Sequence, residues 1–115
     1  MSEELFEEIR AEIVEDTTYA SYQYELLKEE IKDFESTLDQ DHEAMLLLSS
    51  FGQSVAMLVE EIRYANPSII IFDGIVNDKP STLIQHVNQL SFLITSVEKP
   101  AERSRPHRIG FGDPN

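Results

Sequence analysis

The spacing of apolar residues changes from helical to alternating near residue 40, and this change most constrains the fold. Four apolar residues upstream lie four, three and four positions apart: Leu27, Ile31, Phe34 and Leu38. Such spacing predicts a helix with one apolar face, over residues 19–38. After the polar residues 39–43, the period changes from helical to extended. In the segment from Ser54 to Tyr64, every second residue faces the same side, so that Val55, Met57, Val59 and Glu61 alternate with Ala56, Leu58, Glu60 and Ile62. This alternation is typical of strands, so the sequence predicts an α+β domain.

Five strands are expected downstream of the helix, over residues 44–51, 54–64, 68–76, 81–87 and 91–97. Their connections are short, which favours antiparallel neighbours, because parallel pairing requires long crossovers. A shorter amphipathic helix is expected over residues 3–15. The expected fold is therefore a pair of N-terminal amphipathic helices followed by a small antiparallel sheet of about five strands. A partly closed small barrel is the alternative.

Charge divides the chain into two regions. The net charge is −13, and residues 1–43 hold 15 acidic residues against three basic ones, whereas the rest holds seven against six. We expect one structural domain with an acidic helical arm over residues 1–38, an antiparallel β core with a basic tail over residues 39–111, and a disordered end over residues 112–115. Broad binding of nucleic acid is not expected, because it depends on Lys and Arg neutralising phosphates.

The absence of cysteine excludes disulfides, thiolate zinc sites and cysteine nucleophiles. Acidic residues stand at the N-terminus, where a signal peptide has a basic segment and an apolar run. The apolar stretches are far shorter than a membrane span. We therefore expect a cytoplasmic protein that does not enter membranes.

A polar block near the end of the fourth expected strand is the first candidate ligand site. It contains Gln85, His86, Asn88 and Gln89. Amide side chains both donate and accept hydrogen bonds, and imidazole can do either or become cationic near neutral pH. The block could therefore recognise a small polar ligand. The alternative is that these residues, His86 above all, serve the structure.

The basic tail is the second candidate. Its charged and imidazole side chains are Arg103, Arg105, His107 and Arg108. Guanidinium groups bind phosphate through paired hydrogen bonds, and Pro106 restricts the chain between them. The alternative is a flexible tail whose basic side chains balance the negative charge of the acidic helices. Ile109 and Phe111 favour docking of the tail on the core.

Nothing in the sequence specifies a reaction. His42, His86 and His107 lack the spacing of metal ligands, and neither a nucleophile elbow nor a phosphate loop is present. We therefore expect no catalytic residue, no metal and no cofactor, and a protein that is not an enzyme. The Asp73-Gly74 pair indicates a strand irregularity with a close approach of backbone.

Residues 33–111 resemble an uncharacterised bacterial and phage domain family of unknown function. The resemblance rests on Phe34-Glu35, Asp41-His42-Glu43, Ser50-Phe51-Gly52, the strand from Ile69 to Gly74, the LIQHVxQL block from Leu83 to Leu90, and the RIGF ending from Arg108 to Phe111. It implies a shared core that begins near Asp33, and a phage context. A fainter likeness to Sm-like small barrels rests on topology alone.

Two functions from different classes follow as expectations. The first is a non-enzymatic phage sponge that sequesters a nucleotide-derived immune signal, such as an ADP-ribose derivative or a cyclic nucleotide. The second is an acidic protein-interaction module, or an inhibitor that imitates DNA, acting through the N-terminal helices. Hydrolysis of a nucleotide is a disfavoured third.

The apolar face of the helix, formed by Leu27, Ile31, Phe34 and Leu38, is expected to pack either on the chain's own sheet or against another subunit in a homo-oligomer. A homo-oligomer could also form through the sheet.

Overall fold

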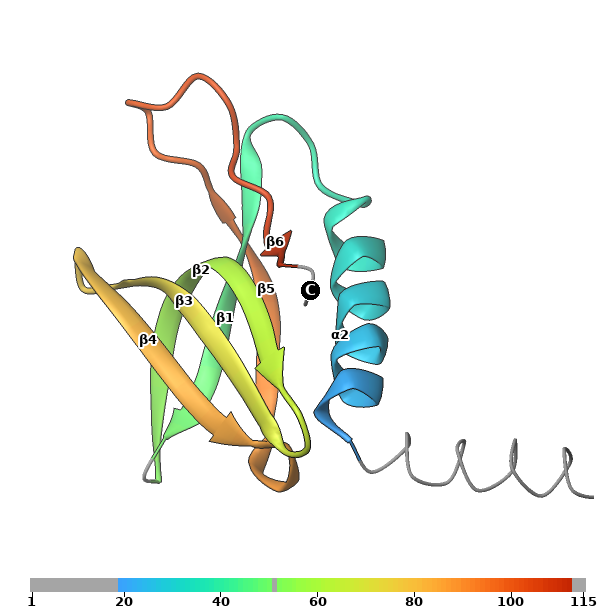
Figure 1. Cartoon of the computed structure of the whole chain (residues 1–115). Coiled ribbons are helices and arrows are strands. Elements are labelled where there is room, and N and C mark those ends of the chain that lie inside the picture. The colour runs from blue at the N-terminus through green and yellow to red at the C-terminus, as the bar shows by residue number, and fades with distance from the viewer. Residues whose placement is uncertain (1–18, 51, 113–115) are drawn as a thin grey trace, which may run out of the picture.

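A computed structural model describes residues 19–50 and 52–112. Helix α2 spans Ala20–Glu35, and six strands follow: β1 His42–Ser50, β2 Gln53–Ala65, β3 Ile69–Val76, β4 Lys79–His86, β5 Phe92–Glu98 and β6 Gly110–Phe111 (Figure 1). A short 3₁₀ helix, η1 (Val87–Gln89), joins β4 to β5. The expected second helix and all five strands are therefore confirmed to within a few residues. The helix expected over residues 3–15 and most of the expected disordered end, residues 113–115, lie outside the described residues.

The strands form an open antiparallel sheet with the order β4-β3-β2-β1-β5. The partly closed barrel is wrong, because β4 and β5, at the two ends of this order, do not pair with each other among the described strands. The expectation of antiparallel neighbours needs one addition. The tail forms β6, which pairs parallel to β2 at Glu61 and Ile62 and adds a sixth, very short strand.

Strand β2 connects the two halves of the sheet. Its first part, up to Met57, pairs with β1, and its second part, from Leu58, pairs with β3. The register of the β2–β3 pair shifts between Val59 and Glu61, opposite Gly74. A Cβ atom on Gly74 would lie 2.3 Å from the carbonyl oxygen of Leu58, so only glycine fits there without movement of the backbone. The irregularity expected at Asp73-Gly74 is confirmed.

Helix α2 lies against one face of this sheet (Figure 1). Its buried residues Ala20, Tyr24 and Ile31 join a core formed by alternate residues of the strands: Leu46, Leu48, Met57, Val59, Ile62, Ile70 and Phe72. Burial of each large apolar side chain contributes about 1.5–3 kcal/mol. Leu27, Phe34 and Leu38 pack at the edge of the same core. The apolar face of the helix thus packs within the chain, on its own sheet, as the first of the two expected alternatives has it.

The start of α2 is capped by residues that are distant in sequence. The side chain of the N-cap residue, Tyr19, makes no capping hydrogen bond within the described part of the chain. Instead, the amide of Ala20 donates to the carbonyl oxygen of Pro67 at 2.7 Å, and the amide of Ser21 donates to Oδ1 of Asn66 at 2.9 Å. These bonds satisfy amides that a helix cannot pair internally, and they attach the helix to the β2–β3 turn.

Among residues 19–50 and 52–112, no helix is both long enough and apolar enough to cross a membrane.

Candidate functional site

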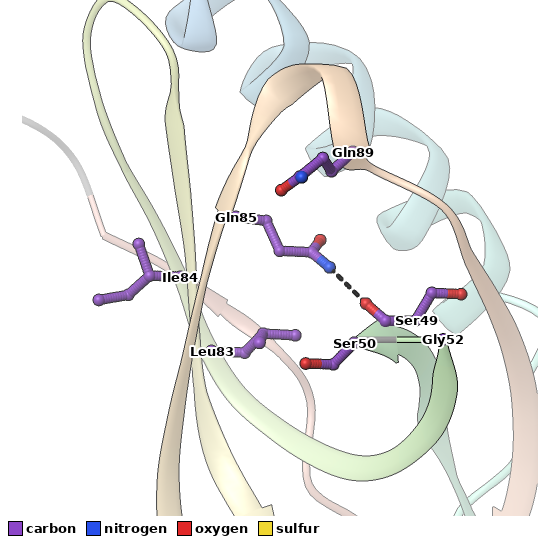
Figure 2. A pocket seen from close by; sticks show the side chains of 7 residues that line it. All are labelled: Ser49, Ser50, Gly52, Leu83, Ile84, Gln85 and Gln89. Atoms are coloured by element: carbon purple, nitrogen blue, oxygen red, sulfur yellow. Dashed lines mark hydrogen bonds between the residues drawn. The ribbon is translucent and has the colours of Figure 1, made fainter.

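A cavity of about 390 Å³ lies between β4 and the β1–β2 hairpin, and we call it the Gln85 pocket. Its lining, shown in Figure 2, comprises Ser49, Ser50, Gly52, Leu83, Ile84, Gln85 and Gln89. The first three residues come from the end of β1 and the turn after it, and the others from β4 and η1. β4 and β1 are not neighbours in the sheet, so the pocket depends on the curvature that brings their ends together.

Gln85 holds the two sides of the pocket together. Its side chain points from β4 towards the hairpin, and Nε2 donates a hydrogen bond to the carbonyl oxygen of Ser49 at 2.7 Å (Figure 2). A carbonyl oxygen can only accept, so this bond determines which end of the amide is nitrogen. Gln85 is only 5% exposed, and its Oε1 is buried without a hydrogen-bond donor among the described residues. The amide therefore presents an unused acceptor.

Two of the four predicted residues in the polar block line the pocket, and two do not. Gln85 and Gln89 are lining residues. The imidazole Nδ1 of His86 instead accepts from the backbone amide of Asn88 at 3.0 Å, which caps η1. His86 and Asn88 therefore shape the turn that positions Gln89. Their observed contacts fit the alternative that these two residues serve the structure.

The described lining residues carry amide, hydroxyl and apolar groups and no charge. Such a surface can form directional hydrogen bonds with an uncharged ligand and can pack against its apolar part. Ser49, Ser50 and Gly52 were not selected as site residues from the sequence. For Ser50 and Gly52 the signal was the Ser50-Phe51-Gly52 segment, which contributed to the family resemblance, and Ser49 directly precedes it.

The basic tail makes contacts of another kind. The guanidinium of Arg103 donates to both oxygens of the Glu43 carboxylate, and the backbone amide of His107 donates to Glu43 Oε2 at 2.7 Å. Burial of Glu43 would raise its pKa, but these hydrogen bonds and the Arg103 charge outweigh burial, so the pKa is lowered. Glu43 is thus held as a carboxylate in the folded protein.

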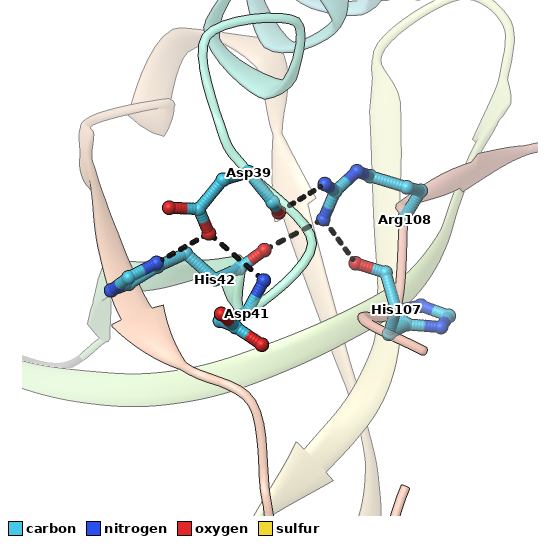
Figure 3. Close-up of polar contacts among 5 residues, drawn as sticks. All are labelled: Asp39, Asp41, His42, His107 and Arg108. Carbon is cyan, nitrogen blue, oxygen red and sulfur yellow. Dashed lines mark hydrogen bonds and ion pairs between the residues drawn. The ribbon is translucent and has the colours of Figure 1, made fainter. Parts of the chain in front are cut away.

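Arg108 attaches the tail to the loop between α2 and β1. Its guanidinium donates to the carbonyl oxygens of His42 at 2.9 Å and Asp39 at 3.1 Å (Figure 3). In the same loop, Nδ1 of His42 lies 2.7 Å from Oδ1 of Asp39. This hydrogen bond raises the pKa of His42 and lowers that of Asp39.

Glu35 completes this set of contacts, although it belongs to α2. The backbone amide of Ile109 donates to Glu35 Oε2 at 2.8 Å, and Ile109 is buried in the core. Burial raises the pKa of the Glu35 carboxyl, against the lowering effect of the Ile109 hydrogen bond and the Arg108 charge. We call Glu35, Glu43, Arg103 and Arg108 the tail clasp. From Ile109 and Phe111, the sequence predicted that the tail docks on the core. The structure confirms this, because Ile109 lies in the core and Phe111 packs against it.

The structure does not bring the two candidate sites together. The tail clasp holds Glu43 at one end of β1, and the Gln85 pocket contacts Ser49 at the other. Six residues of strand span about 20 Å, so one small ligand cannot contact both sites in one chain. Arg103 and Arg108 are engaged in the clasp, whereas exposed Arg105 has no hydrogen bond or ion pair among the described residues.

Titratable groups elsewhere do not form a metal site. Within the described residues, no group of three or more His, Asp or Glu side chains could hold a metal ion. A second cavity, of about 340 Å³, is lined by Asp41, His42, Glu98 and Lys99 near the loop that Arg108 contacts. Its charges are mixed in sign, and it is not among the predicted sites.

Comparison with known proteins gives a family but no activity. A family model described as "Family of unknown function (DUF6173)" matches residues 13–112. Neither a curated protein nor a solved structure matches the chain significantly.

Proposed function

Because the chain belongs to the DUF6173 family of unknown function, we propose its role from its own residues: non-enzymatic binding of a small nucleotide-derived ligand in the Gln85 pocket. The observation that carries this proposal is the Gln85 side chain. It is almost completely buried, it is held in one orientation by Ser49, and its Oε1 lacks a donor among the described residues. A buried acceptor without a donor destabilises a protein by about 1–3 kcal/mol, and a ligand that supplies the donor removes this cost.

The lining supports binding without chemistry. Nucleophilic catalysis by Ser49 or Ser50 would require a neighbouring base, and the described lining residues include no His, Asp, Glu or Lys. The ligand would therefore be held and released intact. Sequestration of a nucleotide-derived immune signal in the host cytoplasm, as a phage-encoded sponge does, is the role that suits such a protein.

The proposal assigns a smaller role in phosphate binding to the basic tail than the sequence suggested. Arg103 and Arg108 are committed to the tail clasp, so they support phosphate binding less than the sequence suggested. Arg105 remains as a tail base for contact with anions. The amides of the Gln85 pocket therefore carry the proposed recognition.

Calorimetric titration tests the proposal directly. The purified protein is titrated with ADP-ribose, its cyclic derivatives and cyclic dinucleotides, and at least one is expected to bind. Ligand recovered after long incubation and heat denaturation should be chemically unchanged. Failure of every nucleotide to bind would refute the proposal, and recovery of a hydrolysed ligand would refute its non-enzymatic part.

One observation favours a second function, an acidic interaction module. The exposed face of α2 carries Glu25, Glu29, Glu30 and Asp33. Tyr22 and Leu26, 39% and 43% exposed, lie one turn apart near the start of this face. Acidic groups beside apolar ones can associate with a basic protein, or imitate the phosphates of DNA.

Inhibition of restriction cleavage tests this second function. The cleavage of plasmid DNA is measured with the wild-type protein and with a variant carrying Glu25→Gln, Glu29→Gln, Glu30→Gln and Asp33→Asn. Inhibition by the wild type that disappears in the variant would support DNA imitation. Absence of inhibition by either protein would count against it.

A further inference from the structure

We infer that the Gln85 pocket takes the base end of the nucleotide, through a ring edge that presents an N–H donor beside an acceptor, while the phosphates stay outside. The inference rests on the proposed function and adds the part of the ligand that is recognised. Three features support it: the orientation of Gln85, the position of Gln89 and the uncharged side chains of the described lining residues.

The orientation of Gln85 specifies a donor on the ligand. Its Nε2 is committed to the carbonyl oxygen of Ser49, so Oε1 is the atom left for recognition. This oxygen is covered in the structure and has no donor among the described residues. A ligand N–H that reached Oε1 would supply the hydrogen bond that this oxygen lacks. Hydrogen bonds contribute most where both groups are buried.

Gln89 supplies the complementary group. It lies on η1, its side chain is exposed, and it lines the same cavity as Gln85. In Figure 2 its amide lies on the same side of β4 as the amide of Gln85, so both amides face the cavity. With Gln85 accepting and Gln89 donating, the two amides match a ring edge that carries a donor next to an acceptor. Glutamine amides read adenine through such a pair of bonds.

The remaining lining excludes the phosphates and suits the ring. No described lining residue is charged, and an ionised phosphate without a cationic partner is strongly disfavoured in such a place. Leu83 points to the same side of β4 as Gln85 and provides apolar surface on which a flat ring can pack, whereas Ile84 points to the other side (Figure 2). The cavity volume of about 390 Å³ lies within the range of small-molecule sites.

Matched nucleosides test the ligand side of the inference. Adenosine and uridine are titrated calorimetrically against their methylated counterparts without the edge N–H: N6,N6-dimethyladenosine and 3-methyluridine. At least one nucleoside should bind, its methylated counterpart about tenfold or more weakly, and ribose 5-phosphate not measurably. Equal binding of the methylated form, or comparable binding of ribose 5-phosphate, would overturn the inference.

Variants test the protein side. Gln89→Ala removes an exposed side chain, so folding should be preserved while nucleoside affinity falls about tenfold. The matched control is Gln40→Ala, at an exposed glutamine outside the pocket, which should bind like the wild type. In nitrogen-15 NMR spectra, the signals of Ser49, Ser50 and the Gln85 side-chain amide should shift on saturation with the nucleoside. Unchanged signals, or equal affinity of the two variants, would contradict the inference.

The outcomes distinguish this inference from the proposed function. If ADP-ribose or a cyclic nucleotide binds but nucleosides do not, the inference fails and the proposed function stands. If neither nucleotides nor nucleosides bind, both fail.

Discussion

The guanidinium of Arg103 donates two hydrogen bonds, of 2.9 and 2.5 Å, to the carboxylate of Glu43, 60 residues earlier in the chain. Glu43 is 1% exposed, so this carboxylate is removed from water and depends on the tail for its partners. The same carboxylate accepts from the amide of His107. The contact joins the beginning of β1 to the segment after β5, and it makes the ordered tail part of the core.

Removal of the Glu43 charge should destabilise the protein. In Glu43→Gln, one carboxylate oxygen is replaced by a donor that faces the donors of Arg103 and His107. The Arg103 side chain is 36% exposed, so the loss should lie below that of a fully buried pair, at about 2–3 kcal/mol in urea unfolding. Glu102→Gln, at the exposed neighbour of Arg103, is the control. Equal unfolding free energies of the two variants would show that the clasp does not contribute.

The two buried carboxyls of the clasp should affect acid stability in opposite directions. The pKa of Glu43 is lowered below its usual 4.5, so its stabilising effect is complete above pH 4.5 and is lost as the pH falls through the folded pKa. Burial raises the pKa of Glu35 above 4.5. The unfolding free energy contributed by Glu35 therefore increases as the pH falls through that raised value towards 4.5.

Urea unfolding at a series of pH values separates these effects. The difference between wild type and Glu43→Gln should change mainly below pH 4.5, and the difference between wild type and Glu35→Gln mainly above it. Both differences changing in the same pH interval would contradict the assigned directions.

His42 should titrate above its usual pKa of 6.5, mainly because Asp39 accepts a hydrogen bond from its ring. NMR titration of the imidazole measures this pKa, and Asp39→Asn should lower it. Asp41→Asn removes a weaker electrostatic contribution and should lower it less. The stabilisation from the His42–Asp39 pair is present below about pH 6.5 and is lost as the pH rises through the folded pKa. An unchanged pKa in Asp39→Asn would refute the assignment.

Gly74→Ala should destabilise the sheet, because the new Cβ would lie 2.3 Å from the carbonyl oxygen of Leu58. The backbone would have to move, at about 1–3 kcal/mol, which corresponds to a melting temperature lower by roughly 5 °C or more. The control is Gly110→Ala, whose nearest contact is the Glu60 carbonyl oxygen at 3.3 Å. Thermal unfolding should therefore rank the wild type and Gly110→Ala above Gly74→Ala.

Tyr24→Phe should weaken the attachment of the C-terminal segment to α2. The Tyr24 hydroxyl donates to the carbonyl oxygen of Gly112 at 2.8 Å, and its ring lies 5.8 Å from that of Phe111, centroid to centroid. Loss of the hydroxyl should cost about 1 kcal/mol, with faster amide hydrogen exchange at Phe111 and Gly112. Tyr22→Phe, at an exposed tyrosine of the same helix, should leave both quantities unchanged.

Helix α2 and strands β1 to β5 could be predicted from the sequence because their patterns are local. A helical stripe and an alternating strand depend on residues two to four positions apart, whose relation is fixed by backbone geometry. The polar block could also be predicted in this way, since Gln85 lies near the end of β4 and Gln89 lies in η1, directly after it. The family model and the resemblance agree on a family of unknown function, because both compare residues in chain order. The expected start of the shared core near Asp33 is wrong, because the family model begins at residue 13 and includes α2.

The partners of those residues could not be predicted, because they come from distant parts of the chain. The contact of Gln85 with Ser49 depends on the curvature of the sheet, and that of Arg103 with Glu43 on the path of the tail. The tail arginines had the composition of a phosphate site, yet two of them bind groups of the chain itself. Arg103 binds the buried carboxylate of Glu43, and Arg108 binds the carbonyl oxygens of Asp39 and His42. The sequence by itself determined the α+β class, the order of the elements and the acidic helical region. Only the tertiary structure decided which polar groups find partners among the described residues and which, like Gln85 Oε1, do not, because strand register and sheet curvature set the distances between residues far apart in sequence.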